Sequence, residues 1–173
     1  LVCSVHTQAE TLFINDATVH TMGIRSTMQD ADILVRDGYI QGLGVDLSAP
    51  ADATVIEAGG RPVTPGLFAG ITSHGLVEIS MVDSSADQAL GGEQMRPEFD
   101  VTTAYNPASG TIPVTRIEGL TWSLLGASQD GSIIGGQGQA VSFDGGYDSF
   151  MGGKVLFISL GAGASAKSHG SRA

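Results

Sequence analysis

The pattern of apolar residues changes at Pro65, and this change constrains the fold more than any other feature of the sequence. Before it, residues 11–62 carry short β-rich runs separated by turn residues, with no helical period. After it, VTPGLFAGIT (63–72) is apolar without alternation, which is typical of a parallel strand buried on both faces. The sequence therefore predicts two parts, a small β-sandwich or layered sheet and then an α/β domain.

The strongest local signal in the first part is Asp37 followed by Gly38, between ADILVR (31–36) and YIQGLG (39–44). An Asp-Gly pair between two apolar runs predicts a β-hairpin with a two-residue turn. Earlier in the chain, TLFIND and ATVHTMG predict two strands broken after Asp16. His20 falls in or just after the second of these strands, where a half-exposed strand histidine is expected.

The second part predicts a strand, a helix and a strand in succession, which favours a right-handed parallel crossover. NPASGTIPVTRIEGL (106–120) predicts the helix, with Gly119 as its C-cap. The apolar side of this helix is expected to carry Ile112, Val114 and Ile117. Two further apolar runs, TWSLLGAS (121–128) and KVLFISLGAG (154–163), predict buried strands.

Three segments of the second part break this regular pattern. Residues 76–107 form a long, polar, irregular connection of a kind that is usually functional or mobile, so we expect it at the mouth of a pocket. GGQG (135–138) predicts a glycine turn, since no Lys-Ser or Lys-Thr pair follows to make a phosphate loop. The closing ASAKSHGSRA (164–173) predicts the first turns of a helix.

Charge and hydropathy exclude several classes of partner. The formal net charge of -10 repels phosphate backbones and anionic lipid surfaces, so neither nucleic acid nor membrane is expected as a partner. No apolar run approaches the ~20 residues of a membrane-spanning helix. A small-molecule substrate is the expected partner, and association into a homo-oligomer stays open. The sequence contains no GxSxG elbow and, beyond Cys3, no cysteine, so no nucleophile is assigned and the catalytic residues remain unknown.

The first nine residues, LVCSVHTQA, resemble the tail of a secretory signal. The small residues Thr7 and Ala9 would stand at the -3 and -1 positions of a cleavage site, so that the mature protein begins at Glu10. This interpretation predicts a periplasmic or secreted protein. The alternative is a frayed N-terminal arm.

Several stretches together resemble the N-terminal part of the amidohydrolase superfamily, specifically the imidazolonepropionase-like branch. They are TLFINDATVHTM, ADILVRDGYIQGLG, VIEAGGRPVTPGL, and NPASGTIPVTRIEGLTWSLLGAS with IIGGQGQAV. The resemblance implies a composite β-sandwich over residues 10–62 and the first strands and helices of a (β/α)8 TIM barrel over residues 63–173. Such a barrel typically takes about 250 residues, so an incomplete barrel and a longer protein are expected.

The same resemblance implies a metal-dependent hydrolase that cleaves carbon–nitrogen bonds in non-peptide or dipeptide amides. One or two divalent ions, zinc above all, would lower the pKa of a bound water and polarise the carbonyl. Similar proteins end the first barrel strand in His-x-His, and here Ile71 and Ser73 stand at those two positions. The family's other ligands belong to later barrel strands, for which His169 comes too early. No metal ligand is therefore assigned in this chain.

Two residues after this strand are candidates for binding substrate. His74 is one position late for the metal pair, and the strand period of two turns it to the opposite face unless a bulge re-aims it. Glu78 is the nearest carboxylate, able to bind a cation or a substrate amine. The alternatives are a loop histidine and an exposed acidic residue. Two functions stay open: an amidohydrolase with a degenerate metal site, and a catalytically inactive binding or scaffold protein that retains the fold.

Overall fold

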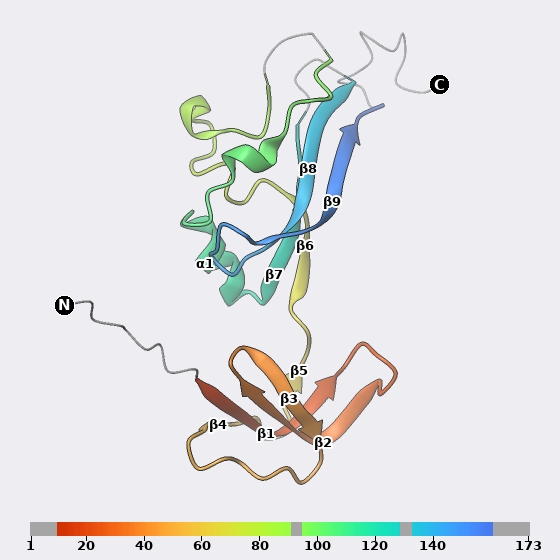
Figure 1. Cartoon of the computed structure of the whole chain (residues 1–173), viewed down its shortest axis with the longest axis vertical. Helices are drawn as coiled ribbons and strands as arrows, with labels where there is room; N and C mark the ends of the chain where they lie inside the picture. Colours follow the sequence, from red (N-terminus) through yellow and green to blue (C-terminus); the bar gives the residue numbers. More distant parts are fainter. Residues whose placement is uncertain (1–9, 91–94, 129–132, 161–173) are drawn as a thin grey trace, which may run out of the picture. The chain divides into compact units, whose positions relative to one another are not determined.

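The computed structural model describes residues 10–90, 95–128 and 133–160. Contacts within the chain separate two compact units, with the boundary between Pro65 and Gly66, and each unit is described by itself (Figure 1). The predicted signal remnant at residues 1–9, the predicted helix start at 164–173 and His169 lie outside the described residues. No helix within the described ranges has the length and apolar character needed to cross a membrane.

Unit 1 is a mixed five-stranded sheet. The strands are β1 Thr11–His20, β2 Thr27–Arg36, β3 Tyr39–Gly44, β4 Thr54–Glu57 and β5 Pro62–Val63. The order is β3-β2-β1-β4, and β5 also pairs with β1. The β1–β2 and β2–β3 pairs are antiparallel, whereas β4 and β5 run parallel to β1. The described residues of this unit thus form one layer of sheet, and a two-layered sandwich remains a prediction.

The hairpin predicted at Asp37 and Gly38 is confirmed. Arg36 of β2 stands opposite Tyr39 of β3, so these two residues form the whole turn. Both have positive φ, 56° for Asp37 and 77° for Gly38. Two consecutive left-handed residues match the right-handed twist of the flanking strands, which is why this dipeptide specifies the turn so strongly.

The break predicted after Asp16 is wrong, because β1 runs through it as one strand ending at His20. The register between β1 and β2 shifts between Ile14 and Ala17, and Asp16 has φ 55°. Its backbone N–H donates at 3.0 Å to the side-chain Oδ1 of Asp32, which lies in β2. A β-bulge, stabilised by the buried Asp32 carboxylate, thus replaces the expected turn.

Unit 2 contains the second sheet, in the order β6-β7-β8-β9. Its elements are β6 Leu67–Thr72, the 3-10 helices η1 Asp83–Ser85 and η2 Val101–Ala104, α1 Thr111–Ile117, β7 Leu120–Leu125, β8 Ile134–Ser142 and β9 Phe150–Ile158. The β6–β7 pair is parallel and α1 lies between the two strands in sequence, so the predicted parallel connection is confirmed. β8 and β9 are antiparallel additions. The protein is therefore rich in sheet with few helices, and the TIM barrel remains a prediction.

Helix α1 buries a different set of side chains from the one predicted. Ile112 is buried, but Val114 is 62% exposed and Ile117 is 83% exposed. The second buried residue is Thr115, whose hydroxyl donates to Thr111 O at 2.8 Å. In a helix of only two turns, a single pair spaced i, i+3 faces the sheet, so the apolar residues outside this pair lie in solvent.

The glycine turn predicted for GGQG is wrong, because residues 135–138 lie inside strand β8. A Cβ at Gly138 would lie 1.9 Å from the carbonyl oxygen of Leu125, and one at Gly136 would lie 2.7 Å from that of Phe99. Gly136 also has φ 121°. These glycines allow other backbone segments to approach β8 more closely than any side chain would permit.

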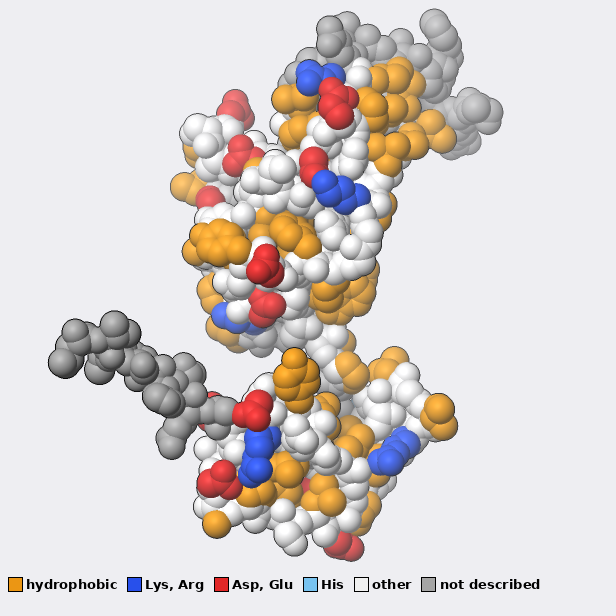
Figure 2. Space-filling model, in the orientation of Figure 1, with side chains coloured by type: hydrophobic (Ala, Val, Ile, Leu, Met, Phe, Trp, Pro, Cys, Tyr) orange, Lys and Arg blue, Asp and Glu red, His pale blue; other side chains and the backbone are white. Residues whose placement is uncertain are grey.

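One face of the second sheet is covered and the other is open. The covered face packs on residues of the 76–112 segment, and the buried cluster consists of Leu76, Val101, Tyr105, Ile112, Leu125, Ala127, Val141 and Phe143. On the open face, Phe68 stacks on Trp122 with ring centroids 4.2 Å apart, and Ile71 is 66% exposed. The prediction that β6 is buried on both faces is wrong for the described residues. Exposed apolar side chains are visible on the surface in Figure 2.

We predict that Gly138→Ala destabilises unit 2 strongly, whereas Gly153→Ala has little effect. The new methyl group at 138 meets the Leu125 carbonyl, and such overpacking costs about 3 kcal/mol. At Gly153 a Cβ meets nothing within 4 Å and φ is not positive, which makes it the matched control. Denaturant unfolding followed by the fluorescence of Trp122 measures both variants. Equal unfolding midpoints for the two variants would contradict the close approach of the Leu125 carbonyl to Gly138.

We also predict that residues 10–173 expressed alone self-associate through the open apolar face of the second sheet. Large exposed apolar patches favour association. Replacing both Phe68 and Trp122 with Ser should lower the associated fraction, measured by size-exclusion chromatography with light scattering. The control is Ile24→Ser, which removes a fully exposed apolar side chain from unit 1. A soluble monomer with a sharp melt before any substitution would overturn the prediction.

Candidate functional site

The candidate site is the turn that follows strand β6. β6 ends at Thr72, and the N–H groups of Leu76 and Val77 both donate to Ser73 O, at 2.9 and 3.0 Å. Gly75 takes φ 78° and closes this turn. The N–H of Gly126, just after β7, donates to Thr72 O at 3.0 Å. The turn therefore lies at the carboxyl ends of the two parallel strands, the edge where α/β sheets commonly bind ligands.

His74 is half-buried in this turn and contacts Phe143. The two rings meet edge to face, with centroids 5.7 Å apart and an interplanar angle of 82°. Because β6 ends at Thr72, the strand alternation used to place His74 and Ser73 on opposite faces does not extend to them. The turn sets the direction of His74. Ile71 is the last of these positions within the strand, and its hydrocarbon side chain offers no ligand atom.

Glu78 is exposed and hydrogen-bonded to a segment distant in sequence. Its Oε1 accepts from Asn106 Nδ2 at 3.2 Å, and its backbone N–H donates to Ser85 O at 3.1 Å. The N–H of Asn106 donates to Gly75 O at 2.8 Å. Asn106 therefore binds the turn twice, once through its backbone and once through its side chain. No pattern in the sequence indicated Asn106, because hydrogen-bonding partners 28 residues apart share no local pattern.

Tyr105 packs beneath the same turn. A Cβ at Gly75 would lie 2.6 Å from its ring, and the ring also meets Phe150 edge to face at 5.4 Å. The Tyr105 hydroxyl is buried and has no hydrogen-bond partner within the described part of the chain. Burial raises the pKa of Tyr105, and the negative charge of Asp144 raises it further. Tyr105 therefore stays protonated near neutral pH and can donate a hydrogen bond.

The described residues do not form a site that fits a divalent metal ion. Within residues 10–90, 95–128 and 133–160, no group of three His, Cys, Asp or Glu side chains is placed to hold one. Stable zinc sites generally use at least three protein ligands, and His74 supplies one imidazole. Glu78 is already engaged by Asn106. The arrangement at this turn suits hydrogen bonding to a polar ligand.

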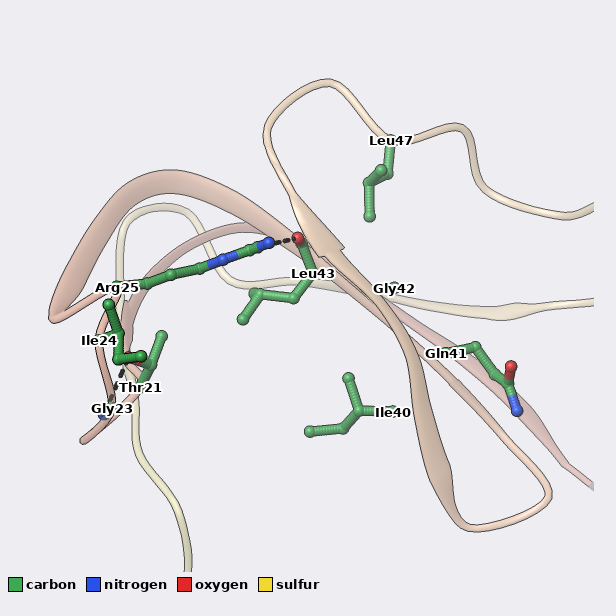
Figure 3. Close-up of a pocket in the computed structure, with 9 residues that line it drawn as sticks. All are labelled: Thr21, Gly23, Ile24, Arg25, Ile40, Gln41, Gly42, Leu43 and Leu47. Carbon is green, nitrogen blue, oxygen red and sulfur yellow. Dashed lines mark hydrogen bonds between the residues drawn. The ribbon is translucent and has the colours of Figure 1, made fainter.

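Unit 1 contains an open groove of about 850 Å³ next to the hairpin (Figure 3). In Figure 3 the side chains of Ile40 and Leu43 extend to the same side of β3, while Gln41 points away. The guanidinium of Arg25, a charged group that lines the groove, donates a hydrogen bond to the backbone oxygen Leu43 O at 2.9 Å. Apolar side chains form much of the lining of the groove, and the hydroxyl of Thr21, which also lines it, donates to Ser26 O at 2.9 Å.

A second pocket of unit 1, of about 450 Å³, is lined by four aspartates, Asp16, Asp30, Asp32 and Asp46. Asp32 is buried and accepts from two backbone N–H groups, that of Asp16 and that of Leu47 at 2.9 Å. These bonds make it part of the β-bulge. The pocket is thus explained by the fold of the sheet.

The comparisons with known proteins find a likeness of fold. An amidohydrolase from Thermotoga maritima MSB8 superposes with a TM-score of 0.73 at 20% sequence identity, over 91% of this chain and 41% of that one. This chain thus corresponds to less than half the length of that protein. A second amidohydrolase structure, 19% identical over 64% of this chain and 24% of its own, has a TM-score of 0.38, too low to carry an argument. No protein-family model and no curated protein matches the sequence.

Asp100 stabilises the segment that leads to Asn106. Its Oδ1 accepts from the N–H of Thr102 at 3.0 Å and so caps η2, and its other oxygen pairs with Lys154 of β9. Burial acts to raise the pKa of Asp100, but the bonds from Lys154 and Thr102 outweigh it, and the pKa is lowered. Ionised Asp100 therefore favours the folded state.

We predict that Asp100→Asn destabilises unit 2 at pH 7 by about 1 kcal/mol, since one charge-assisted bond weakens and Lys154 is half exposed. A lowered folded pKa gives stability that is present above the unfolded value, near 3.8, and lost as the pH falls through the folded value. The difference in the free energy of unfolding between the native protein and the variant should therefore shrink below about pH 4. Urea titrations at pH 7 and pH 3 measure this difference. A difference that grows in acid would contradict a stabilising role for ionised Asp100.

Proposed function

We propose that this chain is the N-terminal part of an amidohydrolase-type hydrolase, of the imidazolonepropionase-like branch, that cleaves carbon–nitrogen bonds in small amides. The observation that carries the proposal is the parallel β6–α1–β7 unit with a polar turn at its carboxyl end, within a fold like that of the Thermotoga amidohydrolase. The motifs around Pro65 and GGQG agree with it. Substrates are non-peptide or dipeptide amides, which a net charge of -10 does not repel when they are neutral or cationic.

In this proposal His74 and Glu78 bind the substrate. An imidazole held by Phe143 can donate or accept a hydrogen bond at an amide, and the Glu78 carboxylate can accept from a substrate N–H or pair with an amine. The buried Tyr105 hydroxyl provides a further donor beneath the turn. Because the described residues do not fit a metal ion, we assign them no part in a metal-assisted step. A divalent ion, zinc in particular, belongs to the proposal only at residues other than these.

The second candidate is a binding or scaffold protein that keeps the fold without turnover. It is favoured by Ile71 and Ser73, which stand where related proteins carry two histidines. Fold alone does not separate the two functions. Incubation of the complete natural protein with a panel of cyclic amides, N-acyl amino acids and dipeptides, added with and without Zn²⁺, separates them. Hydrolysis of any member supports the first function, and saturable binding without product supports the second.

We predict that His74→Ala leaves the metal content of the complete natural protein unchanged while raising KM for its amide substrate. Loss of one hydrogen bond to the substrate corresponds to an increase of about three- to tenfold. Metal content by plasma emission spectrometry should also stay below two ions per chain, before and after the substitution. His20→Ala, in the other unit, is the control and should change neither quantity. Simultaneous loss of metal and activity in His74→Ala would show that His74 is a ligand.

A further inference from the structure

Residues 97–106, here called the strap, connect strand β8 to the turn that carries His74. At the start of the strap, the backbone N–H of Gln137 donates to Phe99 O at 2.6 Å, and its Nε2 donates to Pro97 O at 2.8 Å. Asp100 stands beside Gln137 in a parallel bridge. This end of the strap is therefore hydrogen-bonded to β8 at an isolated β-bridge, beside Gly136, whose lack of a Cβ allows Phe99 to approach closely.

The middle of the strap is fixed by burial and charge. Val101 is fully buried in the core of unit 2, and Asp100 both caps η2 and pairs with Lys154 of β9. Tyr105 follows η2, and its buried ring contacts Phe150 of β9. The strap is thus attached to two neighbouring strands of one sheet, and little freedom remains at its far end.

The far end of the strap holds the turn. Asn106 donates its N–H to Gly75 O at 2.8 Å and its Nδ2 to Glu78 Oε1 at 3.2 Å. The amide side chain is itself oriented, because its Oδ1 accepts from the N–H of Ala108 at 3.0 Å. A short polar side chain on a fixed backbone therefore determines where the Glu78 carboxylate lies.

We propose that Asn106 is a positioning residue, and that the strap attaches the His74 turn to β8 so that Glu78 and His74 keep a fixed direction. Their role toward a substrate rests on the proposed function, whereas the attachment of the turn to β8 does not. The residues that set the geometry of the turn are therefore Gln137 and Asn106, which themselves touch no reacting atom.

The first test exchanges the hydrogen-bonding groups of Asn106 and Glu78 in the complete natural protein. Asn106→Asp keeps the bond from Ala108 but places two carboxylates face to face, so amide hydrogen exchange over residues 74–80 should rise about fivefold, as expected for loss of roughly 1 kcal/mol. Adding Glu78→Gln supplies an Nε2 donor to the new carboxylate and should restore slow exchange. The matched control is Asn15→Asp, since Asn15 Nδ2 donates to Glu57 in unit 1 in the same way.

The rescue distinguishes positioning from a general loss of stability. The melting temperature should stay the same in all three variants, because the bonds between these side chains are exposed. Unchanged exchange in Asn106→Asp, or fast exchange that Glu78→Gln fails to restore, would overturn the proposal. A fall in melting temperature matching the change in exchange would also overturn it.

The second test breaks the attachment of the strap to β8 at a distance from the turn. Gln137→Ala removes the bond to Pro97 O and should raise exchange in residues 74–80 as well as in the strap. Gln139→Ala removes an equivalent bond to Gly152 O from the same strand and should leave the turn unchanged. Equal effects of the two variants on the turn would refute the link. These outcomes need no substrate, so a protein that hydrolyses no amide can still confirm the strap.

Discussion

The close approach of other backbone segments to strand β8 is the constraint on which the second unit depends. Leu125 and Phe99 place their carbonyl oxygens where a Cβ of Gly138 or Gly136 would otherwise stand. The Gly138 contact brings β8 against β7. The Gly136 contact brings residues 97–100 against the part of β8 that extends beyond its pairing with β7. A side chain at Gly138 would separate β8 from β7, and one at Gly136 would separate β8 from the segment that covers the sheet. Both the core and the candidate site therefore depend on these glycines.

The candidate site uses the rigidity that this packing provides. The carboxyl ends of β6 and β7 are joined by the bond from Gly126 to Thr72, and the turn after β6 is held from the other side by Tyr105 and Asn106. The half-buried imidazole of His74 contacts Phe143, the Glu78 carboxylate accepts from Asn106, and the ring of Tyr105 packs at Gly75 and Phe150. The imidazole, the carboxylate and the phenol can each form hydrogen bonds, and within the described residues no three His, Cys, Asp or Glu side chains are grouped to hold a metal ion.

The two faces of the second sheet have different roles. The covered face holds the apolar cluster around Val101 and Leu125. The open face shows Phe68, Ile71 and Trp122, and such a patch favours contact with further protein. The open groove of about 850 Å³ in unit 1 also exposes apolar side chains, Ile24 and Ile40 among them.

Sequence alone determined the features that depend on the conformation of one or two adjacent residues. Asp37 and Gly38 specified a hairpin and Gly119 a helix end, because positive φ is a local preference that neighbouring residues reveal. The change in the pattern of apolar residues at Pro65 likewise predicted that short strands give way to a strand, a helix and a strand. The order strand, helix, strand was predicted correctly, because the spacing of apolar residues within each segment is also a local property.

Tertiary structure decided what distant segments do to one another. Asp16 lies in a β-bulge because the Asp32 carboxylate accepts a hydrogen bond from its N–H. GGQG lies in a strand, with the backbone of Phe99 and Leu125 packed against its glycines. Val114 and Ile117 are exposed because only one side of a two-turn helix meets the sheet. Tyr105 and Asn106 had no signal in sequence at all. Their partners are distant in the sequence, and a local pattern of residues does not predict which distant segment of backbone will pack against them.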